Sequence, residues 1–339
     1  MYQQGTRKTA KPAIWLPVLS VITILSIIIY VIAGLDSFGP VELLALILGE
    51  ISGSGSAHDE LVPLVMQIRV PRALLAVFAG GALALAGVVF QNLLRNVLAD
   101  PYILGIASGA AVGAYMVMLT GAFTIAYFVL PVGAFIGSAI VAGLVYLLSR
   151  SKFTRDHNSL LLGGVMIGTF LSSFLLLILS VERSNYQTAL KWLLGSLSNA
   201  TLESLYYIVP VVLIAGVFVI LKSPSMNILS LGKETATSLG VSPGRLSGQL
   251  YVAGSLLTAI IVCFTGSIGF VGLVIPHICR LVFGPDHRSL APLSFVLGAL
   301  FMLLADFIAK TIVYPIELPV GAITAMIGAP VFILLLRKS

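Results

Sequence analysis

Long apolar runs fill this chain and leave little polar sequence between them. A membrane hydrocarbon core of about 30 Å requires roughly 20 apolar residues in one helix. Runs of this kind predict ten membrane-spanning helices, over residues 13–34, 71–94, 103–120, 122–149, 159–180, 203–222, 246–266, 268–283, 288–312 and 318–337. Glycine or proline interrupts the third, fourth and eighth runs, so these could instead be broken or re-entrant segments.

Composition supports the membrane assignment. The chain has 339 residues, of which 58% are hydrophobic and only 9% are charged, and its mean hydropathy is +1.08. Soluble domains carry about 25% charged residues, so we predict an all-α polytopic membrane protein. Small residues spaced four apart allow helices to pack closely in lipid. Three such pairs predict a tight bundle: Gly109/Gly113, Gly133/Gly137 and Gly164/Gly168.

The basic residues indicate how the helices are oriented. With ten spans and the N-terminus inside, only five of the 19 Lys and Arg residues fall outside, namely Arg69, Arg72, Arg183, Lys191 and Lys310. This bias agrees with the positive-inside rule and predicts that both termini are cytoplasmic. Residues 1–12 then form a short basic cytoplasmic tail, and residues 13–339 form one transmembrane domain. Topology accounts for the net charge of +6, so we expect no nucleic-acid partner.

Two connections are longer than simple turns. Residues 35–68 are predicted to face outside and contain five acidic residues, Asp36, Glu42, Glu50, Asp59 and Glu60. Residues 223–245 are predicted to face inside. Within them, 233–239 is compatible with a helix, Gly240 is a plausible stop and Pro243 follows. This segment could be a helix on which a cytoplasmic partner docks, or only a solvated loop.

Several chemistries are disfavoured by the sequence. A nucleotide-binding P-loop requires G-x-x-x-x-G-K-[ST], and Gly232-Lys233-Glu234 lacks both the first glycine and the hydroxyl. The four histidines are dispersed and show no metal-ligand spacing. We therefore predict no cofactor or metal on this chain. Cys263 and Cys279 lie in apolar runs and are interpreted as buried packing residues.

Intramembrane charge is sparse. A transporter driven by an ion gradient usually shows a chain of intramembrane carboxylates, whereas here only Asp306 lies deep in a span. Lys310 follows Asp306 by four residues, which predicts an ion pair along one helix face. An intramembrane protease is disfavoured because it would require Ser with His, or paired aspartates, at mid-depth, and only Asp306 lies there.

Three outward-facing cations could serve an external partner. Arg69 and Arg72 lie at the predicted outer end of the second span, where Pro71 suits a first helical turn. Lys310 lies at the outer end of the ninth span. Snorkelling of the long side chains could explain any one of them. Together they resemble a docking site for carboxylates of an external protein, since such rim charges orient a partner. The outer segment 185–195, with Trp192, could be a half-helix at a pore mouth or an interfacial anchor.

At this point the residues resemble a known family, the permease subunits of type II ABC importers for ferric siderophores, haem and cobalamin. The matching stretches cover nearly the whole chain after the first helix. They are Arg69-Val-Pro-Arg-Ala-Leu74, Gly87-Val-Val-Phe-Gln91, Asn96-Val-Leu-Ala-Asp-Pro101, Leu104-Gly105, Gly109-Ala-Ala-Val-Gly113, Gly269-Phe-Val-Gly-Leu-Val-Ile-Pro-His277, Asp286-His-Arg288, Ala305-Asp306, Glu317-Leu-Pro-Val-Gly321 and Gly328-Ala-Pro-Val-Phe332.

The resemblance implies ten helices per subunit, a second permease copy or homologue, two cytoplasmic ATPases that bind ATP, and an external substrate-binding protein or lipoprotein. It implies a location in the bacterial cell membrane. Arg69, Arg72 and Lys310 would receive acidic residues of the binding protein. Residues 229–244 would form coupling helices in an ATPase groove, through Leu231, Gly232, Lys233, Glu234, Ala236, Leu239, Gly240 and Val241. Asn96, Leu98, His157 and Asn158 match regions that close the inner gate.

The chain departs from the family pattern at two positions. Lys310 stands where relatives often have Arg, which weakens bidentate carboxylate binding. Val97 stands where they usually have Pro. The cargo expected from the resemblance is a ferric siderophore or similar metal chelate, with haem or cobalamin as alternatives. An ion-coupled secondary transporter remains the rival from another class.

Overall fold

The computed structural model describes residues 12–33, 63–150, 157–182 and 185–337. Over these residues, seven helices are long and apolar enough to cross a membrane, and three shorter apolar helices accompany them. Each of the ten overlaps one predicted run, so the all-α class is confirmed and the helix count agrees with the predicted ten spans. The tail before residue 12 and most of the predicted outer loop, residues 34–62, lie outside the described residues.

The helix bounds follow the chain in order. The spans are α1 (Pro12–Ile32), η2 (Leu64–Arg69) continuing into α3 (Val70–Leu94), α4 (Ile106–Leu119), α5 (Val129–Arg150), α6 (His157–Val181), α8 (Leu202–Ser230), α10 (Pro243–Thr265), α11 (Val271–Phe283), α12 (His287–Thr311) and α13 (Val320–Leu336). Between them lie the short helices η3 (Pro101–Leu104), η4 (Ala122–Thr124), α7 (Tyr186–Leu193) and α9 (Lys233–Ser238).

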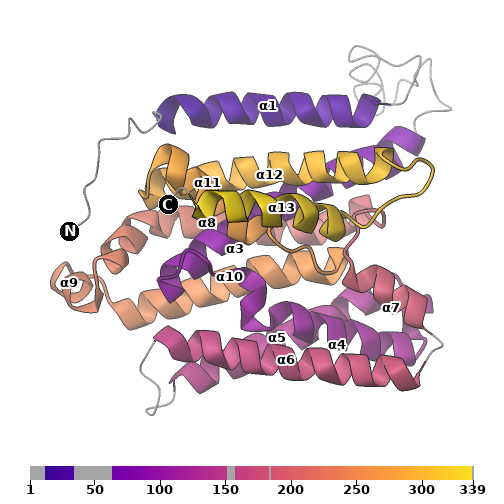
Figure 1. Cartoon of the computed structure of the whole chain (residues 1–339), viewed down its shortest axis with the longest axis horizontal. Helices are drawn as coiled ribbons and strands as arrows, with labels where there is room; N and C mark the ends of the chain where they lie inside the picture. The colour runs from indigo at the N-terminus through magenta and orange to yellow at the C-terminus, as the bar shows by residue number, and fades with distance from the viewer. Residues whose placement is uncertain (1–11, 34–62, 151–156, 183–184, 338–339) are drawn as a thin grey trace.

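Helix α3 is the centre of the bundle (Figure 1). Its residues from Pro71 to Leu94 are almost all buried, and α8, α10, α11 and α12 pack around it. Close packing is possible because the helix is rich in Ala and Gly. The backbone of Gly80 meets that of Gly298 on α12, and the backbone of Gly87 meets that of Gly272 on α11, so neither site leaves room for a Cβ. Dispersion contacts between such close backbones stabilise helix pairs in lipid.

The predicted glycine pairs are confirmed as packing contacts. Gly109 and Gly113 on α4 lie against the backbones of Gly137 and Gly133 on α5. A Cβ on Gly164 of α6 would lie 2.6 Å from the Cα of Leu104, and one on Gly168 would lie 3.2 Å from the Cα of Gly105. Helices α4, α5 and α6 therefore form a second packed group beside the α3 group.

The second span begins earlier than predicted. It starts at Leu64 rather than residue 71, and its first six residues form a π-helical turn. Proline lacks an N–H and usually ends or kinks a helix, so Pro71 predicts that the span begins there. In the structure the Val70 N–H bonds to the Val65 carbonyl five residues back, and this wider turn carries the helix through the proline. Arg69 and Arg72 consequently lie within the span rather than at its end.

The sixth span is also longer than predicted. Helix α8 continues from Leu202 to Ser230, past Lys222 and through Pro224. The remaining connection carries α9, which confirms the helix expected near 233–239. Gly232 and Gly240 flank α9 with φ values of 119° and 78°, a region that glycine enters at little cost. The short outer segment is helical too, as α7.

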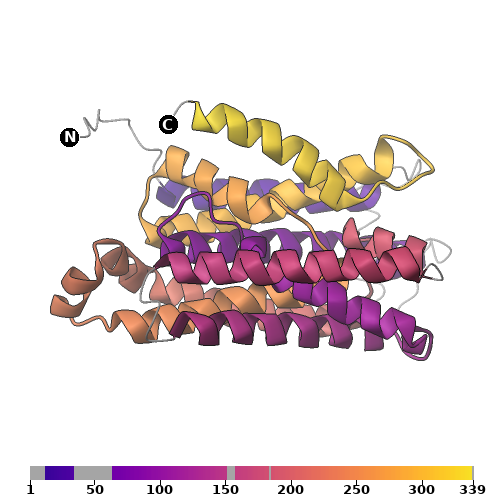
Figure 2. The same cartoon turned by 60° about the horizontal axis from the view of Figure 1, so that its bottom comes forward.

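The two ends of the bundle carry different elements. The start of α1, the end of α13 and the projecting helix α9 lie at one end (Figure 1). Helix α7 and the loop between α12 and α13 lie at the opposite end, and the view in Figure 2 shows the same separation. The bundle therefore has one face that presents α9 and another that presents α7 and the α12–α13 loop.

Candidate functional site

A buried ion pair joins α3 to α12 near the end that presents α7. Arg72 Nε lies 2.8 Å from Asp306 Oδ2, and Arg72 Nη2 lies 3.0 Å from Asp306 Oδ1. The two side chains are only 9% and 1% exposed. Parallel N–H donors on a planar guanidinium match both carboxylate oxygens, which makes this bidentate geometry strong and specific. The pair therefore holds the two helices in one register.

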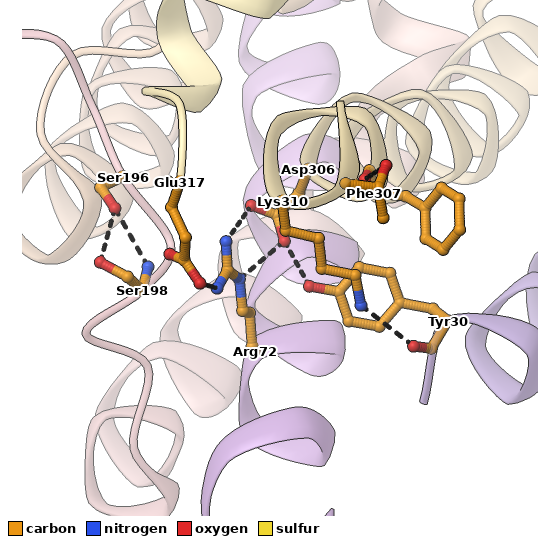
Figure 3. A network of polar contacts seen from close by, with 9 residues as sticks. Tyr30, Arg72, Ser196, Ser198, Asp306, Phe307, Lys310 and Glu317 are labelled. Carbon is orange, nitrogen blue, oxygen red and sulfur yellow. Dashed lines mark hydrogen bonds and ion pairs between the residues drawn. The ribbon is translucent and has the colours of Figure 1, made fainter. Parts of the chain in front are cut away.

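A second carboxylate reaches the same arginine from the α12–α13 loop. Arg72 Nη1 donates to Glu317 Oε1 at 2.8 Å, and the Glu317 side chain is 48% exposed (Figure 3). Arg72 thus has one buried partner and one partner open to solvent. The exposed pair is worth little by itself, so the loop is held less firmly than α12.

Tyr30 of α1 completes this outer cluster, which we define as Tyr30, Arg72, Asp306, Lys310 and Glu317. The Tyr30 hydroxyl donates to Asp306 Oδ2. Lys310 Nζ lies 3.5 Å from the Tyr30 ring centroid and donates to the Tyr30 carbonyl at 3.1 Å (Figure 3). The predicted Asp306–Lys310 ion pair is wrong. Arg72 donates to both Asp306 oxygens, and Lys310 instead contacts the end of α1.

Arg69 caps the same end of α1. Its Nη1 donates to the carbonyls of Val31 and Ala33, each at 2.7 Å. The last carbonyls of a helix have no partner within the helix and carry partial negative charge, so cations stabilise them. All three cations expected to meet an external protein therefore have partners within the chain. Their docking role stays a prediction.

A cavity of about 430 Å³ opens beside Glu317. It lies between α7 and the loops that precede α8 and α13, and it is lined by Trp192, Ser196, Phe264, Glu317 and Pro319 among others. Figure 3 shows Ser196 and Ser198 on the side of Glu317 away from Lys310. Glu317 consequently belongs both to the ion-pair cluster and to the wall of this outer cavity.

The opposite end of α3 carries a second polar site. Pro276 removes the N–H that would pair with the Gly272 carbonyl in α11, and Gln91 Nε2 donates to that carbonyl at 3.3 Å. Arg280 Nη1 in turn donates to Gln91 Oε1 at 3.1 Å. These side chains line a cavity of about 510 Å³ that also includes Asn92, Arg95, Asn227 and His287. This site is not predicted from the sequence, because isolated amide side chains form no motif.

The residues expected to engage an ATPase surround α9. Leu231 and Leu239 are 65% and 56% exposed. Lys233 and Glu234 are exposed, whereas Ala236 is buried and attaches the helix to the bundle. The two exposed leucines flank a short projecting helix, where a partner groove could bury them. The remaining expected residues, Gly232, Gly240 and Val241, shape the turns around it.

The expected gate residues are only partly described. Asn96 Oδ1 accepts the Leu98 N–H at 2.9 Å, which closes a tight turn after α3. Val97 and Leu98 are each 42% exposed at the tip of this turn. His157 and Asn158 begin α6, but their side chains lie outside the described part of the structure. The gate role of all four residues stays a prediction.

The described residues contain no group of three or more His, Cys, Asp or Glu that could hold a metal ion. What they do contain is a ten-helix membrane bundle with a polar site at each end and a helix projecting from one face. These features define a multi-pass membrane transport subunit. The chain belongs to the FecCD transport family, whose model matches residues 22–338.

Individual relatives are similar over most of the chain. The cobalamin import permease BtuC of Halobacterium salinarum is 39% identical over 274 residues, covering 81% of this chain and 73% of its own. The Fe(3+)-citrate import permease YfmE of Bacillus subtilis is 34% identical over 335 residues, covering 99% and 98%. A solved structure assigned to a metal-chelate type ABC transporter in an inward-facing conformation has a TM-score of 0.83 at 29% identity, covering 96% of this chain and all of its own. The predicted family and permease fold are confirmed.

Proposed function

We propose that this permease imports a ferric siderophore or a similar metal chelate, driven by two cytoplasmic ATPases and supplied by an external binding protein. The observation that carries the proposal is α9, a short exposed helix held between two glycine turns beyond the ends of α8 and α10. The chain lacks a P-loop of its own, so a partner that binds ATP would move this helix.

Coupling would run through the two exposed leucines that flank α9. Burying a leucine contributes about 1.5–3 kcal/mol, and Leu231 and Leu239 are both largely exposed. Ala236 and Val241 pack the segment onto the bundle, so a groove that grips the leucines also moves the ends of α8 and α10. The ATPases would thereby change the tilt of these helices as they close on ATP.

The opposite face would receive the binding protein. Arg69 and Lys310 are half-buried at this rim, and a carboxylate from outside could join their existing carbonyl partners. Arg72 could meet such a carboxylate only if the half-exposed Glu317 moved aside. A positive rim of this kind attracts acidic side chains and raises the association rate. In this proposal α9 would lie in the cytoplasm together with both termini, which agrees with the distribution of basic residues.

A second permease would complete the pathway. Helix α6 is the least buried of the long apolar spans, because only 17% of an 18-residue apolar stretch within it is buried. Met166, Phe170 and Leu177 on it are 65%, 69% and 64% exposed. An apolar wall of this kind suits a bulky chelate, because it lets the chelate pass without binding it tightly. The turn Asn96–Leu98 at the cytoplasmic end would close the route.

Reconstitution tests the proposal. The permease, its ATPase and its binding protein are incorporated in proteoliposomes, and uptake of a ferric hydroxamate, haem and cobalamin is measured with ATP on the ATPase side. We expect ATP-dependent uptake of the ferric chelate. Cobalamin is the second candidate because of the 39% identical cobalamin permease. If only cobalamin is taken up, cobalamin and not a ferric chelate is the cargo. Uptake that does not depend on ATP would refute the proposed energy source.

A further inference from the structure

The last turn of α8 is joined to α3 and α12 by a chain of side-chain hydrogen bonds. This turn leads directly into Leu231 and α9, so any force on α9 arrives here first. We define the cytoplasmic clamp as Asn92 on α3, Asn227 on α8, and Asp286 and His287 at the start of α12. Asn92 and His287 are 8% and 6% exposed, Asn227 is partly buried and Asp286 is exposed, so the clamp runs from the interior of the bundle to its surface.

Asn227 is the central member of the clamp. Its Nδ2 donates to Asp286 Oδ1 at 2.6 Å, and its Oδ1 accepts the backbone N–H of His287 at 2.9 Å. Asp286 Oδ1 also accepts the Arg288 N–H at 3.0 Å and so caps α12. The hydrogen bonds from the Arg288 N–H and from Asn227 lower the pKa of Asp286, which keeps it an ionised acceptor.

The direction of the remaining bonds follows from this arrangement. His287 Nδ1 lies 2.7 Å from Asn227 Oδ1. A carbonyl oxygen only accepts, so Nδ1 carries the ring proton and Nε2 of the neutral ring is an acceptor. Nε2 lies 3.3 Å from Asn92 Nδ2, a donor. The bonds therefore run in one sense, from Asn92 through His287 and Asn227 to Asp286.

A second set of bonds joins α3 to the same turn of α8. Asn92 Nδ2 lies 2.9 Å from Ser230 Oγ, and Arg95 Nη2 donates to the Leu229 carbonyl at 3.3 Å. Arg95 ends α3 in a left-handed conformation with φ 49°. Glycine is the usual residue in this conformation, because a side chain beyond Cα adds backbone strain there. The guanidinium that bridges to α8 is therefore kept at the expense of backbone strain.

We propose that the cytoplasmic clamp transmits movement of α9 to α3 and α12, with Asn227 as its positioning residue. The inference rests on the proposed function, in which an ATPase moves α9. Helices α3 and α12 are also joined at their other end by Arg72 and Asp306, so they move as one body. A displacement of α8 passed to that body reaches Glu317 and the entrance to α13, on the far side of the bundle.

The test exchanges donor and acceptor. Asn227→Asp places a second carboxylate against Asp286 and breaks the chain. Asp286→Asn alone keeps an acceptor for Asn227 and still caps α12, since Asn and Asp cap helices about equally well. In the double variant Asn227→Asp/Asp286→Asn, the new amide donates to the new carboxylate and the bond is restored with its direction reversed. Gln187→Glu, on the exposed face of α7, is the matched amide-to-carboxylate control.

The readout is substrate transported per ATP hydrolysed, together with co-purification of the ATPase. Residues in contact within one hydrogen-bond network are energetically coupled, so we expect Asn227→Asp to lower the transport-to-hydrolysis ratio about tenfold. Co-purification should be unchanged, the double variant should recover most of the ratio, and the control should match the wild type. Asn227→Ala, which removes the bonds without adding charge, should also lower the ratio if Asn227→Asp does not fold.

Each outcome has a distinct meaning. A normal ratio in Asn227→Asp or in Asn227→Ala would overturn the clamp, and so would a double variant no better than Asn227→Asp. If the wild-type permease transports without an ATPase, the proposed function fails instead. A wild type that couples transport to ATP together with an unaffected Asn227→Asp refutes only the clamp.

Discussion

Replacing Asp306 by Asn should destabilise the protein more than any other single change in the outer cluster. The substitution leaves the Arg72 guanidinium buried without its bidentate partner, close to two further cations, Arg69 and Lys310. Only the half-exposed Glu317 remains to pair with it. Removing one partner of a buried ion pair costs about 3–5 kcal/mol. Melting temperatures of larger domains shift by about 2 °C per kcal/mol, so we expect a decrease of about 6–10 °C.

The measurement is thermal unfolding of the purified permease in detergent or nanodiscs, followed by loss of the monodisperse peak on size exclusion. Arg72→Met combined with Asp306→Asn removes the unpaired charge and leaves an acceptor for Tyr30, so this double variant should be more stable than Asp306→Asn alone. Glu317→Gln is the control and should shift the melting temperature by less than about 2 °C, because exposed pairs contribute little. An Asp306→Asn variant that melts within 2 °C of the wild type would refute the buried-pair account.

Three further predictions concern Leu239, Glu317 and Asp100. Leu239→Asp should weaken ATPase co-purification about tenfold or more, because burying a leucine side chain in an interface contributes about 1.5–3 kcal/mol to binding. Glu317→Gln should bind the external protein up to about fivefold more tightly, because it no longer competes for Arg72. Burial raises the pKa of Asp100 to about 6, whereas the pKa of an aspartate in the unfolded chain is near 3.9. The melting temperature of the wild type should therefore rise as the pH falls through 6, and that of Asp100→Asn should not.

Each of these predictions has a result that would contradict it. Unchanged co-purification of Leu239→Asp would count against α9 as the ATPase contact. Weaker binding of the external protein to Glu317→Gln would show that Glu317 supports docking rather than competing with it. Parallel melting curves for the wild type and Asp100→Asn between pH 7.5 and pH 5 would show that Asp100 is not the group that titrates.

Much of the fold follows from local pattern. Ten apolar runs predict ten helices because each must satisfy its own backbone in lipid, and the glycine pairs predict a tightly packed bundle. Two of the predicted boundaries are wrong, and both lie next to a proline. A π-turn before Pro71 carries the second span back to Leu64, and α8 passes through Pro224 to Ser230. Neighbouring helices can satisfy the carbonyls that a proline frees, and the sequence gives no sign of this.

The candidate site was predicted less well, because its partners are far apart in the chain. Asp306 was paired with Lys310, its neighbour along the helix, whereas its true partner Arg72 is 234 residues away. Tyr30 stands alone in apolar sequence and Asn227 belongs to no motif, so neither indicates a site. By contrast, α9 was predicted closely, because glycine stops and a polar helix between them are local features.

The central claim is that this chain is a passive conduit whose energy comes from a partner ATPase. The most direct test compares purified permease alone in liposomes with the same preparation carrying its ATPase and binding protein. The account predicts accumulation of chelate only in the complete assembly and only with hydrolysable ATP. Accumulation by the permease alone, driven by an ion gradient, would contradict it.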